Sequence, residues 1–259
     1  MKIRRILSTI ILSAATACVF RPNSPAPTHT ILKPVCETAG TTQRIAIAPQ
    51  VEIVLYLPPC FNPQAKNPYP VLYLLPGSSG NESDWFDQGA DKVADASILA
   101  GEIPPFLIAA IGDISYDLDS RIVIETILPY IDGHYPVGKD RRYRAAAGGS
   151  YGGAAAYHLA FKHPELFSSA GIFGNGAAQG EEDSIRQWLT AIPKNIRPRV
   201  FLNSGLNDPY MLDRARVLIQ ILDAAGTSHT EIFSAGGHSY AYWISNFPAY
   251  FRWLAEDWR

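Results

Sequence analysis

The chain has no block of like charges and no internal repeat along its 259 residues. Lysine and arginine together number 22, aspartate and glutamate number 24, and the formal net charge is -2. Without a basic stripe, the sequence lacks the electrostatic signature of a nucleic-acid-binding surface, and without an acidic run it lacks a solvating tail. It also lacks metal-ligand spacing of histidine, cysteine or carboxylates, so we expect neither a metal nor another cofactor. An apolar fraction of 47% is typical of one globular domain.

The apolar run at the N-terminus is too short to span a membrane. It follows the basic segment Met1–Arg5, extends over Ile6–Ala17 and ends in the small residues Ala15-Thr16-Ala17. This order predicts a secretory signal peptide over residues 1–17. An amphipathic first helix of the fold is the alternative, but no polar helical face is visible. The expected location is outside the cytoplasm, as an extracellular, periplasmic or lipid-anchored protein.

Cysteine is scarce, and the first of the three cysteines, Cys18, directly follows the predicted signal peptide. The sequence around Cys18 resembles a bacterial lipoprotein box, although Ala15 stands where that motif usually has leucine. Two alternatives follow: a membrane tether through lipidated Cys18, or ordinary cleavage after Ala17. The prolines among the polar residues of the next segment cannot build a core, so residues 18–40 are expected to form an extended tether.

The other two cysteines, Cys36 and Cys60, flank the first two strand-like segments. In an exported chain they can form a disulfide that fastens the incoming segment to the edge of the sheet. Two free buried thiols are the alternative.

From about residue 41 to residue 259, strand-like and helix-like segments alternate, which predicts one catalytic domain of the α/β class. The first two strands are joined by a Pro-Gln turn and should form an antiparallel hairpin at one edge. The remaining strands should form a mostly parallel central sheet with helices on both faces. The expected strands are Thr42–Ala48, Val51–Leu57, Val71–Leu75, Phe106–Ile111, Tyr143–Ala147, Ser168–Phe173, Val200–Asn203 and Thr230–Ser234. The expected helices are a stretch ending near Ala100, Asp119–Tyr135 with a kink or break at Pro129, Ala154–His163, Met211–Ala225 and Tyr240–Trp258.

The segment Gly148–Gly153, with the sequence Gly-Gly-Ser-Tyr-Gly-Gly, lies between an expected strand and an expected helix. A Gly-x-Ser-x-Gly turn in this context is typical of the nucleophile elbow of α/β-hydrolases. The tight turn exposes the serine hydroxyl at the carboxyl edge of the sheet, which makes Ser150 a candidate covalent nucleophile. A glycine-rich turn with a polar cap residue is the alternative.

A serine nucleophile requires a base and an acid, which follow it in the order Ser, Asp or Glu, His in this fold. Of the six histidines, only His238 lies after the last expected strand and before the last helix. Asp208 follows the strand before it, although Asn-Asp before proline also makes a good helix N-cap. The other acids in this interval have less suitable places, because Asp213 and Asp223 fall on a helix and Glu181–Asp183 has the character of a solvated charge cluster.

The expected oxyanion hole has two backbone N–H donors. One belongs to the residue after the nucleophile, Tyr151, and the other to the loop Pro76–Gly80 after the third strand. We expect Ser78 to be this second donor, with Ser79 as the alternative. A phosphate cradle is disfavoured because no Walker lysine follows the loop.

With these residues located, the chain resembles the esterase D family of α/β-hydrolases, which includes S-formylglutathione hydrolases, feruloyl and acetylxylan esterases, mycolyltransferases and enterochelin-esterase-like proteins. The similar segments are Val71–Gly77, Asp84-Trp85, Gly148–Gly153, Phe161–Phe167, Ser204–Asp208 and Gly236–Trp243. Two residues depart from the family pattern: Pro76 replaces a histidine that often braces the oxyanion loop, and Tyr151 replaces a methionine.

The resemblance implies a serine esterase with Ser150, Asp208 and His238 as catalytic residues. Candidate substrate contacts are Ser79, Trp85 and Tyr240, within a set of site-loop aromatics that also includes Phe86, Tyr116, Tyr151, Tyr242 and Trp243. These aromatics could stack on a sugar or feruloyl ring, or they could equally be core side chains. For Trp243, on the last helix, a core position is expected. The expected partner is a small-molecule or carbohydrate ester carrying a feruloyl or acetyl group, because the signal peptide disfavours a cytosolic glutathione thioester. An acyltransferase, separable by product analysis with an acceptor alcohol, and a non-catalytic binding protein, separable by fluorophosphonate labelling, are the alternatives.

Overall fold

The fold is taken from a computed structural model, which describes residue 36, residues 38–112 and residues 121–258. The expected signal peptide, Cys18 and Tyr116 lie outside these residues. No helix in the described part of the chain has the length and apolar character needed to cross a membrane.

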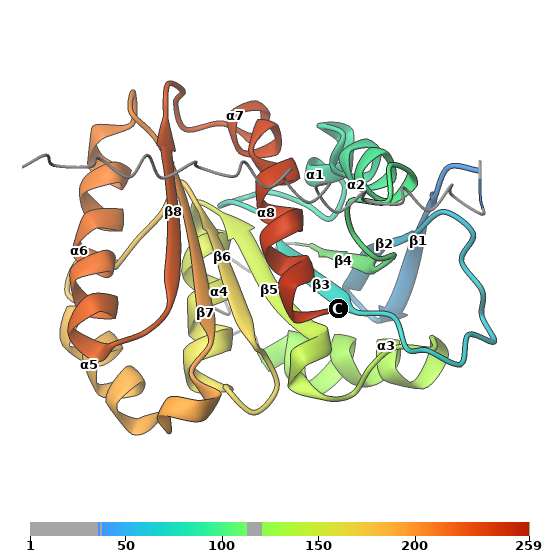
Figure 1. The fold of residues 1–259 in the computed structure, drawn as a ribbon, viewed down its shortest axis with the longest axis horizontal. Coiled ribbons are helices and arrows are strands. Elements are labelled where there is room, and N and C mark those ends of the chain that lie inside the picture. The colour runs from blue at the N-terminus through green and yellow to red at the C-terminus, as the bar shows by residue number, and fades with distance from the viewer. Residues whose placement is uncertain (1–35, 37, 113–120, 259) are drawn as a thin grey trace, which may run out of the picture. The chain divides into compact units, whose positions relative to one another are not determined.

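The described residues form a central sheet whose strand order is β1-β2-β4-β3-β5-β6-β7-β8 (Figure 1). The β1–β2 and β2–β4 pairs are antiparallel and the other neighbours are parallel, which confirms the predicted mostly parallel sheet with an antiparallel edge hairpin. In parallel strands the carboxyl ends meet at one edge, which is where ligands bind in open α/β sheets. The strands are β1 (Thr41–Ala48), β2 (Val51–Leu57), β3 (Val71–Leu75), β4 (Leu107–Ile111), β5 (Arg144–Gly149), β6 (Ser169–Phe173), β7 (Arg199–Gly205) and β8 (His229–Ser234).

Helices cover both faces of the sheet, as the sequence predicts (Figure 1). On one face lie α3, α4, α5 and α6, and on the other lie α1, α2, α7 and α8. Their bounds are α1 (Asp84–Asp87), α2 (Ala90–Leu99), α3 (Leu128–His134), α4 (Tyr151–Lys162), α5 (Glu182–Ala191), α6 (Pro209–Ala225), α7 (Tyr240–Ser245) and α8 (Phe247–Leu254).

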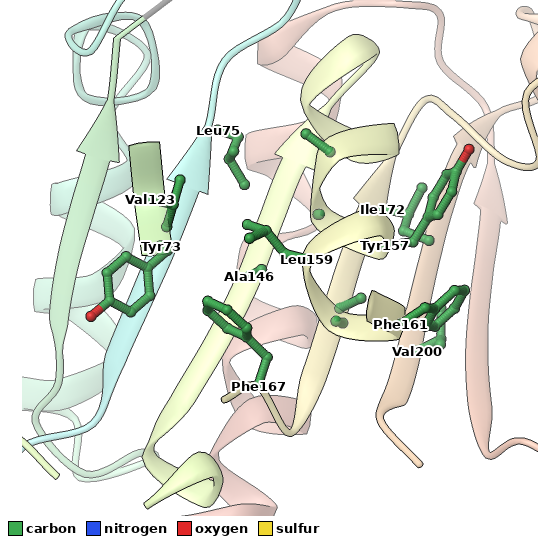
Figure 2. Close-up of a cluster of buried hydrophobic side chains, with 14 of the residues drawn as sticks. Tyr73, Leu75, Val123, Ala146, Tyr157, Leu159, Phe161, Phe167, Ile172 and Val200 are labelled. Carbon is green, nitrogen blue, oxygen red and sulfur yellow. The ribbon is translucent and has the colours of Figure 1, made fainter. Parts of the chain in front are cut away.

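Strand β3 divides the core into its two layers, because successive side chains of a strand point to opposite faces. Val71, Tyr73 and Leu75 belong to the cluster beneath α3–α6, which Figure 2 shows in part. Leu72 and Leu74 belong to the cluster beneath α1, α2, α7 and α8. All five residues are fully buried, which accounts for the continuous apolar run in the sequence.

Pro129 and Pro248 each lie in the first turn of a helix, and hydrophobic periodicity alone does not predict a helix start at either place. Near Pro129 the chain stays helical: a π-helical stretch, Val123–Ile127, precedes α3, and Pro129 lies in the first turn of α3. The expected helix over 240–258 is instead two helices separated at Asn246, because Pro248 occupies the first turn of α8. Proline has no backbone N–H, so it is accommodated best where that donor has no partner inside the helix.

Helix α5 begins where the sequence analysis places a solvated charge cluster, and that interpretation is wrong for two of its residues. Glu182 forms an ion pair with Arg214 of α6. Glu181 accepts a hydrogen bond from Tyr157 Oη at 2.7 Å and lies 3.0 Å from His158 Nε2. These carboxylates therefore fasten α5 to α4 and α6.

The cysteines Cys36 and Cys60 form a disulfide with a Cα–Cα distance of 5.9 Å, as the exported-chain interpretation predicts. The bridge closes a separation of 24 residues, for which the chain-entropy treatment gives a stabilisation of about 3 kcal/mol. Four residues further on, Gly40 N–H lies 3.0 and 3.1 Å from the two carboxylate oxygens of Asp95. The end of the expected tether is thus attached to the domain at both Cys36 and Gly40.

Candidate active site

Ser150 lies between β5 and α4 in a backbone conformation that non-glycine residues rarely adopt, with φ 52° and ψ -121°. The glycines two residues before and after it make this turn possible. A Cβ on Gly148 would lie 2.3 Å from the carbonyl oxygen of Gly152, and a Cβ on Gly152 would lie 2.3 Å from that of Pro76. The Gly-x-Ser-x-Gly spacing is therefore a steric requirement of the turn at Ser150.

The turn is held by groups from the neighbouring strand β6. Ser150 N–H donates to the carbonyl of Phe173 at 2.8 Å, and the side-chain amide of Asn175 donates to the carbonyl of Ser150. Sequence reasoning missed Asn175, although its place just after β6, at the same carboxyl edge, could have indicated it. These contacts fix the backbone from which the Ser150 hydroxyl projects.

The structure brings Asp208 and His238 together, with Asp208 Oδ2 2.6 Å from His238 Nδ1. Their two loops are joined through the backbone, because Leu206 N–H donates to Ser234 O and Asn207 N–H donates to Gly236 O, each at 2.9 Å. The Asp208 side chain is largely buried and His238 is partly exposed. A buried carboxylate on Nδ1 favours the tautomer in which Nε2 accepts a proton.

Asp208 combines the two roles that the sequence left open. Its Oδ1 accepts the N–H of Met211 at 3.5 Å and so caps helix α6, while its Oδ2 contacts His238. The helix cap holds the carboxylate in place for the histidine.

Trp243 of α7 is buried and packs against both His238 and the elbow strand. Its ring centroid lies 5.1 Å from that of His238 in an edge-to-face arrangement. A Cβ on Gly149 would lie 2.4 Å from its ring. The expectation of a core position for Trp243 is confirmed, and this core side chain connects the histidine loop to the residue before Ser150.

The loop after β3 lies next to the elbow. A Cβ on Gly77 would be 3.7 Å from Ser150 Cβ, which is van der Waals contact. Ser78 and Ser79 are exposed, and Ser79 has a φ of 59°. On the other side, Tyr151 directly follows Ser150 and is the first residue of α4.

Trp85 requires a correction, because its side chain has no exposed surface. Its indole N–H donates to Leu75 O at 3.0 Å, and its ring stacks on Phe247 and meets Tyr240 edge-on. The expected substrate contact of Trp85 is therefore wrong, and the ring instead packs in the core against Phe247 and Tyr240. The alternative that the sequence left open, a core side chain, holds for Trp85.

No group of three histidine, cysteine or carboxylate side chains in the described part of the chain is arranged to hold a metal ion. The reactive groups at the edge where the strands β5, β7 and β8 end are the Ser150 hydroxyl on the elbow and the His238–Asp208 pair.

The sheet order, the elbow and the carboxylate–histidine loops define an α/β-hydrolase. A family model described as "Putative esterase" matches residues 46–254, and the chain belongs to this esterase family.

The chain is also similar to individual proteins. An uncharacterized protein of Corynebacterium glutamicum is 26% identical over an alignment of 238 residues, and the match covers 78% of this chain and 56% of the relative. An endo-1,4-beta-xylanase/feruloyl esterase of Xylanibacter ruminicola is 28% identical over an alignment of 189 residues, and the match covers 68% of this chain and 25% of the relative. The chain thus spans about half and a quarter of the lengths of these two relatives.

Among solved structures, the feruloyl esterase module from Clostridium thermocellum, a serine-to-alanine mutant complexed with sinapinate, superimposes with a TM-score of 0.74. The two chains are 16% identical, and the match covers 90% of this chain and 94% of the module. At this identity the likeness concerns the fold.

Proposed function

We propose that this chain is a serine esterase that hydrolyses carboxylic esters through an acyl-enzyme on Ser150. The observation that carries the proposal is the 2.6 Å contact between Asp208 and His238, in loops at the same sheet edge as the strained Ser150 turn. The experiment that tests it compares ester turnover by the full chain with turnover by Ser150→Ala.

In this mechanism His238 Nε2 takes the proton of Ser150 Oγ as the oxygen attacks the ester carbonyl. The carboxylate of Asp208 stabilises the imidazolium that forms. The carbonyl oxygen becomes an oxyanion, which accepts hydrogen bonds from the N–H groups of Tyr151 and Ser78. When the C–O bond to the leaving alcohol breaks, His238 returns the proton to the alcohol.

The second half of the reaction repeats these roles with water. His238 removes a proton from the water as its oxygen attacks the acyl carbonyl, and then protonates Ser150 Oγ as the acid is released. An alcohol in place of water would give acyl transfer instead.

For the substrate we propose an ester on a carbohydrate, with a feruloyl or acetyl group as the acyl part. Support comes from the feruloyl esterase relatives and from two exposed apolar side chains that flank Asp208. Leu206 is 52% exposed and Tyr210 is 58% exposed, although large apolar side chains are usually covered. An exposed tyrosine ring beside the acid offers a surface on which a sugar ring of the leaving group can stack.

Removing the ring with Tyr210→Ala should raise KM for a feruloylated oligosaccharide by roughly 3- to 10-fold, the equivalent of one aromatic contact. The variant should leave KM for methyl ferulate unchanged, because that ester has no sugar. Steady-state kinetics on both esters measure the difference, and Tyr210→Phe, which keeps the ring, should restore the parent KM. An equal rise for both esters would show that Tyr210 does not contact the carbohydrate.

We further propose that the chain is exported, with residues 1–17 as signal peptide and Cys18 as the first mature residue. The disulfide between Cys36 and Cys60 supports an oxidising compartment. The intact mass of the full chain expressed in a bacterial host should equal that of residues 18–259, plus lipid if Cys18 is acylated. A charge-reversed Arg4→Glu/Arg5→Glu variant should remain unprocessed. A product that retains Met1 in the parent protein would contradict export.

A further inference from the structure

The hydroxyl of Tyr240 connects two segments of the site that lie far apart in the sequence. It accepts a hydrogen bond from Gly77 N–H at 3.0 Å and donates to Asp84 Oδ2 at 3.3 Å. Gly77 is 163 residues away and belongs to the loop after β3, whereas Tyr240 opens α7, two residues after His238. The contact therefore links the expected oxyanion loop to the histidine segment.

Asp84 lies at the other end of this loop and accepts hydrogen bonds from within it. Its Oδ2 also accepts the backbone N–H of Asn81 at 3.1 Å, and its Oδ1 accepts the side-chain amide of Asn81 at 2.8 Å. Within the loop, Gly80 N–H donates to Gly77 O at 3.0 Å. Tyr240 is thus attached to both ends of a compact turn that runs from Gly77 to Asp84.

The aromatic ring of Tyr240 has a fixed position of its own. It meets Trp85 edge-on at a centroid distance of 4.8 Å and Trp243 at 5.1 Å. Burial raises the pKa of Tyr240 to about 12, so the hydroxyl keeps its proton and remains a donor to Asp84 across the neutral range. A rigid ring with a protonated hydroxyl can hold the loop at a defined distance.

The arrangement determines which loop amide can face the substrate. Gly77 N–H is engaged by Tyr240, and Pro76 has no N–H. Ser78 N–H has no hydrogen-bond partner among the described residues, and it follows Gly77, on which an added Cβ would lie 3.7 Å from Ser150 Cβ. Oxyanion donors act through exact placement, since they must lie about 2.7–3.1 Å from the developing charge.

From these contacts we infer that Tyr240 is a positioning residue for the oxyanion hole, holding Gly77 and Asp84 so that Ser78 N–H faces the tetrahedral intermediate. The inference rests on the proposed esterase function and deepens it. It replaces the expected direct contact of Tyr240 with the substrate, because the hydroxyl already has two protein partners.

The test is Tyr240→Phe in the full chain, which keeps the ring against Trp85 and removes only the hydroxyl. Because the positioned donor acts on the transition state, kcat and kcat/KM for p-nitrophenyl acetate should fall together by roughly 10- to 100-fold, with KM little changed. Affinity for a phenylboronic acid, which forms a tetrahedral adduct on the serine, should fall in parallel. Affinity for the released carboxylic acid product should stay the same.

The matched control is Tyr143→Phe. Tyr143 is also half-buried, and its hydroxyl accepts a hydrogen bond from Arg142 at 2.8 Å, but it precedes β5 at the opposite end of that strand. This variant should keep the parent kcat and boronate affinity. A second variant, Asp84→Asn, should lower kcat by less than Tyr240→Phe, and the double variant should be no slower than Tyr240→Phe alone, because the two groups act as one support.

Unchanged kcat and boronate affinity in Tyr240→Phe would overturn the positioning role, as would a rise in KM alone, which would assign the hydroxyl to substrate binding. If Tyr240→Phe does not fold, a parent-like kcat in Asp84→Asn overturns the role and a reduced kcat supports it. Failure of the esterase proposal is distinguishable, because the parent protein itself would then neither turn over the ester nor bind the boronate.

Discussion

Replacing Ser150 by alanine should lower kcat for p-nitrophenyl acetate by on the order of 10⁴- to 10⁶-fold, the range seen when the nucleophile of a serine hydrolase is removed. The acyl-enzyme route needs the Ser150 oxygen, which alanine lacks. The backbone amides that would bind the oxyanion remain in the variant. A residual rate above that in water is therefore expected, while covalent catalysis is lost.

The matched control for this variant is Ser228→Ala. Ser228 is exposed and directly precedes β8, so it lies at the end of that strand opposite the histidine loop. It should keep the parent rate, and both variants should unfold at the parent temperature, because each removes one exposed or half-buried oxygen. Parent-like turnover by Ser150→Ala would exclude Ser150 as the nucleophile.

Replacing Asp208 by asparagine should lower kcat by about 10⁴-fold, as in serine hydrolases whose triad acid becomes an amide. The amide N–H of asparagine can donate to His238 Nδ1, which favours the tautomer whose Nε2 already carries a proton and cannot accept one from Ser150. The helix cap should survive, because asparagine caps helices about as well as aspartate. The loss should therefore appear in kcat and leave the free energy of unfolding nearly unchanged.

Asp213→Asn provides the comparison for this variant on the same helix. Asp213 is exposed and pairs only loosely with Arg216, at 3.6 Å. It should retain full activity, measured by steady-state kinetics beside thermal unfolding of both variants. An Asp208→Asn protein that is unstable but fully active per folded molecule would leave Asp208 as a helix cap alone.

The central strands of the sheet could be predicted from the sequence because they are buried on both faces. Val71–Leu75 is apolar at every position, and the structure places alternate residues in two separate core layers. The elbow was equally visible, since the steric requirement at Gly148 and Gly152 leaves a pattern of glycines in the sequence. Strong local constraints of this kind can be recognised in the sequence before the fold is known.

Other features depend on contacts between distant residues and left no local pattern. The continuous helix expected over 240–258 is interrupted at Asn246. Pro248, which has no backbone N–H, lies in the first turn of the second helix, α8. Helix α5 was missed because its acidic start has the character of a loop until Arg214 and His158 are seen beside it. Trp85 lies near the site loops in sequence, which left a substrate contact and a core position both open, and only its packing against Phe247 and Tyr240 decides for the core.

The same distinction between local patterns and long-range contacts applies to the candidate site. The residue types and their order along the chain pointed to Ser150, Asp208 and His238. The contact between Tyr240 and Gly77 could not be anticipated, because it requires α7 and the loop after β3 to approach across 163 residues of sequence. The order of residue types along the chain identifies the groups that can react. The contacts that hold these groups in place depend on how distant segments pack together.

Trapping of the acyl-enzyme tests the central claim most directly. The full chain is mixed with p-nitrophenyl acetate, quenched in acid within the first turnover, digested and analysed by mass spectrometry. We predict one acetyl group on the peptide that contains Ser150, and none in Ser150→Ala. An acetyl group at another residue, or turnover with no acylated peptide at any quench time, would contradict the account.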